Sequence, residues 1–80
     1  MAGQPIPITQ EDIDNRFDFH GAMGEKAERH SAVRTLLKRT AENLLTLIPP
    51  GRDASRAIAD LEDAMFHANA AIAREAPETA

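Results

Sequence analysis

Residues 25–48 contain no glycine or proline and end at the sequence Pro49-Pro50-Gly51. Within this stretch apolar residues recur at the spacing of one helix face, namely Val33, Leu37, Ala41 (or Thr40), Leu44 and Ile48. A stripe of this kind is typical of a long helix that buries one side. The prolines end the helix, because the residue before a proline avoids the helical region of backbone space. The rest of the chain must therefore supply a partner for this helix.

A second stripe on the same stretch is basic. His30, Arg34 and Lys38 are spaced four residues apart, so in a helix their side chains lie along one line. A line of cations without an interleaved acid indicates an anion site, because like charges at this spacing are mildly destabilising. The alternative is an ordinary solvated face, in which the arginines pair with neighbouring acids; the candidates are Arg29 and Arg39 with Glu25, Glu28 and Glu42.

The sequence after the prolines predicts a second helix, capped by Asp53 or Ser55 and running to about Glu75, before Pro77. Its apolar residues also follow one face: Ala54, Ala57 or Ile58, Leu61, Met65, Ala68 and Ile72. Two long helices joined by a short turn form an antiparallel hairpin.

The amino-terminal part of the sequence predicts a short helix that packs against the hairpin. Thr9 and Asp12 have the spacing of a capping box, and Ile13 and Phe17 form one apolar edge. We therefore expect an all-α fold, with a flexible arm at residues 1–8, a single helical-hairpin domain at residues 9–75 and a flexible tail at residues 76–80.

The loop after the short helix holds Phe19 and His20. Phe19 either plugs the end of the core or offers a flat face on which a nucleobase can stack. His20 either donates to a phosphate or hydrogen-bonds a nearby carbonyl.

Length and composition favour a homo-oligomer. The chain has 80 residues, no cysteine and no Trp or Tyr. Domains of this size bury so little surface on folding that a single chain is only marginally stable. The second helix also carries a further apolar face, formed by Ala59, Phe66, Ala70 and Ala73. Alanine is tolerated anywhere in a helix, but an exposed phenylalanine more often marks a contact surface. We therefore place Phe66 and Ala70 at an oligomer interface.

Charge and motifs exclude several functions. The net charge of −4 disfavours binding of long nucleic acid through a basic surface. We find no secretion signal and no membrane span, and so expect a soluble, cytoplasmic protein. His20, His30 and His67 lack partners at metal-ligand spacing, and no nucleophile, phosphate loop or carboxylate pair is evident. The expected protein is a binder without metal, cofactor or enzymatic activity.

Four blocks of the chain together resemble a known family: NRFxFH at 15–20, AERHxxVR at 27–34, PPxR at 49–52 and LExAMFxANAAIAR at 61–74. They resemble the helical-hairpin domain of phage cyclic-nucleotide sponges, the anti-CBASS and anti-Thoeris proteins. The resemblance implies an all-helical homohexamer that sequesters the second messengers of host defence, in the host cytoplasm, without cleaving them. The implied ligands are cyclic dinucleotides such as 3',3'-cyclic GMP-AMP, with cyclic trinucleotides or cyclic ADP-ribose variants in some relatives.

Carried onto this chain, the resemblance puts base stacking on Phe19, where relatives often have tyrosine, and a phosphate contact at or near Arg34. Arg74, the arginine that closes the last block, is a further ligand-binding candidate. The basic stripe adds His30 and Lys38 as ligand-binding candidates, and the loop adds His20. Because Arg34 lies nearer this loop than Lys38, we expect Arg34 to matter more for ligand binding. Two other interpretations remain: a protein-interaction module that inhibits a host protein through Phe66 and the alanine face, and a small nucleic-acid-binding regulator.

Overall fold

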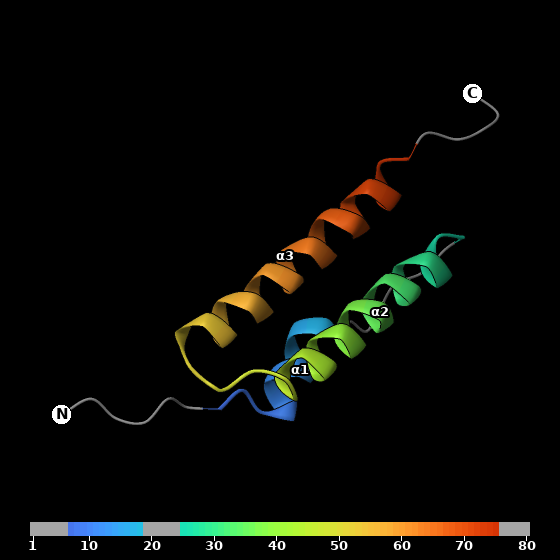
Figure 1. The fold of residues 1–80 in the computed structure, drawn as a ribbon. Helices are drawn as coiled ribbons and strands as arrows, with labels where there is room; N and C mark the ends of the chain where they lie inside the picture. The colour runs from blue at the N-terminus through green and yellow to red at the C-terminus, as the bar shows by residue number, and fades with distance from the viewer. Residues whose placement is uncertain (1–6, 19–24, 76–80) are drawn as a thin grey trace.

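The computed structural model describes residues 7–18 and 25–75, and within these ranges the chain is helical without a strand. Helix α1 spans Gln10–Phe17, α2 spans Ala27–Leu45 and α3 spans Arg52–Ala73. Figure 1 shows α2 and α3 running side by side in opposite directions, with α1 lying against α2. The predicted order of a short helix followed by a long hairpin is therefore confirmed.

Helix α1 begins with the predicted capping box. The Asp12 amide N–H donates to the Thr9 hydroxyl, and the Thr9 amide N–H donates to the Asp12 carboxylate, both at 3.2 Å. These bonds satisfy two of the amides that a helix start leaves without partners. An eight-residue helix is still too short to persist alone in water, so α1 depends on what it packs against.

The residue that caps the start of α3 differs from the predicted one. Neither Asp53 nor Ser55 caps the helix: Gly51 is the N-cap residue and no side chain bonds the free amides there. Gly51 adopts φ 148° and ψ −170°, a conformation that only glycine enters without strain. The chain therefore turns into the helix directly after glycine, and Asp53 lies inside the first turn of α3.

The core lies where the three helices meet. Its buried members come from all of them: Ile13, Phe17, Ala41, Ile58 and Met65. The predicted stripe of α3 is confirmed, since Ala54, Ile58, Met65 and Ile72 are its buried residues. On α2 only Ala41 is buried, and Val33 and Leu37 pack against the core from a half-buried position. The short helix contributes more than an edge, because Phe17 is 0% exposed.

Hydrogen bonds connect the start of α2 to the end of α3. Lys26 Nζ donates to the carbonyl oxygens of Ile72 (2.8 Å) and Glu75 (3.2 Å), where the free carbonyls of a helix end favour a cation. Next to it the Arg29 guanidinium bonds both carboxylate oxygens of Glu75, at 2.9 and 3.0 Å. Arg29 thus pairs across the hairpin with Glu75, not with the acids of its own helix that the sequence suggested.

Among the residues that the structure describes, none of the helices combines the length and hydrophobicity that crossing a bilayer requires.

Candidate functional site

A hollow of about 500 Å³ lies where the three helices face one another. We call it the three-helix hollow; its lining comes from the end of α1, the first half of α2 and the middle of α3, namely Asn15, Arg16, Phe17, Asp18, His30, Arg34, Glu62, Met65, Phe66 and Asn69. Three predicted site residues, His30, Arg34 and Phe66, therefore share one hollow although they come from two helices.

Two polar residues form the α2 side of the three-helix hollow. His30 Nδ1 donates to Asn69 Oδ1 of α3 at 2.9 Å, which fixes the orientation of the imidazole ring. Arg34 follows one turn later, is half-buried, and already interacts with another group of the protein. A guanidinium has five N–H donors, so an interaction within the protein does not exhaust its capacity to bind an anion.

The opposite side of the hollow pairs an arginine with a glutamate. Arg16 Nη1 of α1 lies 3.4 Å from Glu62 Oε1 of α3, and both side chains are partly buried, with exposed fractions of 33% and 25%. Phe66, one turn after Glu62, keeps 54% of its surface exposed. The hollow thus combines an exposed ring with paired charges.

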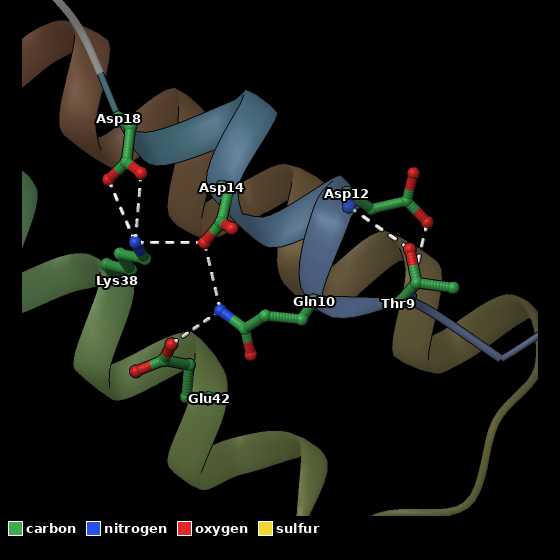
Figure 2. Close-up of polar contacts among 7 residues, drawn as sticks. All are labelled: Thr9, Gln10, Asp12, Asp14, Asp18, Lys38 and Glu42. Atoms are coloured by element: carbon green, nitrogen blue, oxygen red, sulfur yellow. Dashed lines mark hydrogen bonds and ion pairs between the residues drawn. The ribbon is translucent and has the colours of Figure 1, made fainter.

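Lys38 lies outside the three-helix hollow and serves a different contact. Its ammonium is 2.9 Å from Asp14 Oδ1 and bonds both carboxylate oxygens of Asp18 at 2.9 and 3.0 Å (Figure 2). The acids missing from the basic stripe of α2 are therefore supplied by α1. Beside Asp14, Gln10 Nε2 donates to both Asp14 (3.0 Å) and Glu42 (2.8 Å), so the same network holds α1 on α2.

These contacts shift two ionisation equilibria. The hydrogen bond from Gln10, followed by that from Lys38, lowers the pKa of Asp14 below its ordinary 3.8. The carboxylates of Asp14 and Asp18 raise the pKa of Lys38 above 10.5. Lys38 stays charged under all ordinary conditions, and its charge is directed at α1.

A second, smaller hollow of about 380 Å³ lies over α2, lined by Asp18, Ser31, Arg34, Thr35, Lys38, Arg39 and Glu42. Arg34 and Asp18 line both hollows. The predicted pair of Arg34 and Lys38 is thus brought together here, but with two carboxylates beside it.

The remaining candidates lie elsewhere. Phe19 and His20 fall outside the described residues, directly after Asp18 in the chain. Arg74 is exposed at the C-cap of α3 and is not part of the three-helix hollow, whereas Ala70 is half-buried on α3. Within residues 7–18 and 25–75, no three His, Cys, Asp or Glu side chains gather as they would around a metal ion.

A family model described as the hairpin domain of Acb2/Tad1 matches residues 9–73. The chain belongs to the Acb2/Tad1 hairpin family. The match confirms the resemblance to the anti-CBASS and anti-Thoeris proteins and covers α1, α2 and α3 in full. Comparisons with curated proteins and with solved structures found no match.

Sequence reasoning missed several residues of this Acb2/Tad1 hairpin that line the hollow: Asn15, Arg16, Glu62, Met65 and Asn69. All five lie inside the blocks that carried the family resemblance, which is the signal that could have found them. The helical periodicity could not, because they belong to α1 and α3 and meet only through the packing of the hairpin.

The Asp14 network makes the stability of the Acb2/Tad1 hairpin depend on pH. Because the folded pKa of Asp14 lies below 3.8, its contribution is complete above 3.8 and is lost as the pH falls through the folded value. On acidification from about pH 5 to pH 3, we expect the thermal midpoint of the wild type to fall further than that of Asp14→Asn. Circular dichroism melts measure this. Asp63→Asn, at an exposed position of α3, is the control and should follow the wild type; identical acid profiles for all three proteins would contradict the role of the network.

Proposed function

We propose that this protein is a phage immune-evasion sponge that binds and sequesters cyclic oligonucleotide second messengers without cleaving them. We propose further that it assembles as a homohexamer, and that cyclic dinucleotides such as 3',3'-cyclic GMP-AMP are bound at the three-helix hollow. Cyclic trinucleotides and cyclic ADP-ribose variants are further candidates. Membership of the Acb2/Tad1 family suggests this function, and the chemistry of the hollow supports it.

The observation that carries the proposal is the meeting of Arg34 and Phe66 in one hollow of about 500 Å³. This volume falls within the range of roughly 300–1,000 Å³ that is usual for small-molecule sites. A cyclic dinucleotide combines two phosphates with two flat bases, so its receptor needs donors for phosphate and faces for stacking. Guanidinium groups bind phosphate oxygens in pairs, and aromatic rings stack on bases. Phe19, the residue after Asp18 in the sequence, is the proposed second ring.

The exposure of the lining argues for a second subunit. Phe66 remains 54% exposed although it lines the hollow, and a ligand with twofold character fits an interface that supplies matched pairs of residues. In this arrangement His30, Arg34, His20 and Phe19 would contact the ligand, with Phe66 and Ala70 at the contact between subunits and Arg74 at a separate site.

The test is a calorimetric titration of the purified protein with a panel of cyclic di- and trinucleotides and cyclic ADP-ribose variants. We expect a saturable heat with at least one cyclic dinucleotide, and recovery of intact nucleotide when the complex is denatured by heat. Light scattering should give a mass several times that of the 8.7 kDa chain. A monomer that binds none of the panel would contradict the proposal and favour a module that binds a host protein through Phe66.

Replacing Phe66 with glutamate should weaken assembly. A carboxylate at this position either loses its hydration inside a subunit contact or prevents that contact from closing. Size-exclusion chromatography with light scattering should therefore report a smaller species for Phe66→Glu at micromolar concentration. Leu47→Glu is the matched control, because Leu47 is also exposed, at 79%, but lies beyond the end of α2. Equal elution volumes for Phe66→Glu and the wild type would place Phe66 outside the interface.

A further inference from the structure

Among the described residues that line the three-helix hollow, positive and negative charges are balanced. Arg16 and Arg34 contribute two positive charges, and Asp18 and Glu62 contribute two negative ones. A hollow built only to hold phosphate would not place carboxylates in its wall, since they repel the ligand. Each carboxylate has a cationic partner in the protein, Asp18 with Lys38 and Glu62 with Arg16, but a carboxylate with acceptor positions to spare can also accept hydrogen bonds from a ligand.

Glu62 is the better placed of the two acids. Its side chain is 25% exposed against 40% for Asp18, and Asp18 already accepts two hydrogen bonds from Lys38. Within residues 7–18 and 25–75, Glu62 is approached by Arg16, whose Nη1 lies 3.4 Å from Oε1. A carboxylate has about four acceptor positions, so Glu62 keeps capacity to accept further bonds while Arg16 holds its orientation.

An apolar side chain and an aromatic ring lie next to this acceptor. Met65 and Phe66 follow Glu62 at the i+3 and i+4 positions of α3, on the same side of the helix. Both line the hollow with Glu62. Proteins that read an unpaired base combine such apolar or aromatic faces with hydrogen bonds to the Watson–Crick edge.

A guanidinium and a carboxylate side by side can offer an N–H donor next to two acceptor oxygens. Guanine has the complementary edge, because O6 accepts a hydrogen bond while N1–H and N2–H₂ donate in the same direction. Adenine offers one donor at N6 and a lone pair at N1 that a carboxylate repels. Uracil has a single donor between two carbonyls. Only guanine matches the pair at all three positions.

We propose that Glu62, oriented by Arg16, selects guanine at one base position of the bound messenger. This inference rests on the proposed function, because it names the base specificity of the same hollow. It also accounts for a carboxylate in a site otherwise suited to anions.

The experiment compares cyclic di-GMP with cyclic di-AMP, measured by calorimetry on the intact oligomer. Wild-type protein should bind cyclic di-GMP about tenfold or more tighter, which lies within the discrimination that one bidentate contact to a base supplies. In Glu62→Gln the amide N–H₂ faces the guanine donors, so the ratio of the two Kd values should fall toward one, mainly through weaker cyclic di-GMP binding. Asp63→Asn is the control: it changes the charge equally at the next, exposed residue of α3 and should keep the wild-type ratio.

The outcomes separate this inference from the proposed function. Two outcomes overturn guanine selection by Glu62: equal affinity of the wild-type protein for both ligands, or a ratio of Kd values in Glu62→Gln that matches the wild type. Neither outcome contradicts the proposed function. A ratio that falls equally in Asp63→Asn points to net charge and also overturns guanine selection by Glu62. A wild-type protein that binds no cyclic nucleotide overturns the proposed function and this inference together.

Discussion

Replacing Phe17 with alanine should lower the free energy of unfolding by about 3–5 kcal/mol, the usual cost of removing a buried phenylalanine ring. Phe17 is 0% exposed and packs with Ile13, Ala41, Ile58 and Met65. Small proteins have only about 5–15 kcal/mol of stability, so this one change removes a large part of it. Chemical denaturation followed by circular dichroism measures the loss.

A control separates core packing from the general effect of losing an apolar side chain. Leu47 is 79% exposed, and Leu47→Ala should change the free energy of unfolding by no more than about 0.5 kcal/mol. A Phe17→Ala protein as stable as the wild type would mean that α1 unfolds independently of the hairpin.

The second large effect is expected for ligand binding. Arg34→Ala should weaken binding of a cyclic dinucleotide roughly ten- to a hundredfold, because a hydrogen-bonded charge contact contributes about 1.5–3 kcal/mol. Arg34 lines both hollows, and its fork-shaped guanidinium can meet two phosphate oxygens at once. Lys38→Met should weaken binding much less, since the Lys38 ammonium is directed at Asp14 and Asp18. Calorimetry on each variant, after its oligomeric state has been checked by light scattering, gives the comparison.

Arg39→Ala is the matched control for Arg34. It removes the same side chain from the same helix at an exposed position that lines the second hollow but not the three-helix hollow. Because the proposed ligand site is the three-helix hollow, the affinity of Arg39→Ala should stay close to that of the wild type. Arg34→Ala with wild-type affinity would move the phosphate site elsewhere, and Arg74 at the end of α3 would be the next residue to replace.

The fold could be predicted from the sequence because its signals are local. The capping box of Thr9 and Asp12 and the apolar stripe through Ile58 and Met65 each act over a few residues. The prolines placed the end of the first long helix only approximately, because α2 ends at Leu45 and its C-cap Thr46 lies three residues before Pro49. The error at the start of α3 has the same origin. Asp53 and Ser55 are good capping residues, but the backbone of Gly51 already makes the turn, and a sequence pattern does not reveal that competition.

The site was less accessible to sequence reasoning, because its lining depends on how three helices meet. The spacing of His30, Arg34 and Lys38 indicated one continuous basic surface. Packing divides it: His30 bonds Asn69 of α3, and Lys38 bonds Asp14 and Asp18 of α1. Periodicity within α2 contains no information about carboxylates on another helix.

If the three-helix hollow is the ligand site that we propose, the docking of α1 sets a limit on ligand affinity. This helix has eight residues, and together with its C-cap Asp18 it carries the core side chain Phe17 and the acids that face Lys38. Residues 15–18 form one wall of the three-helix hollow, so a molecule with α1 undocked has an incomplete site. The apparent Kd is then the intrinsic Kd divided by the fraction of molecules with α1 in place. Substitutions that tighten α1 on α2 should therefore increase affinity without touching the ligand, and the same substitutions should slow amide hydrogen exchange in α1 first.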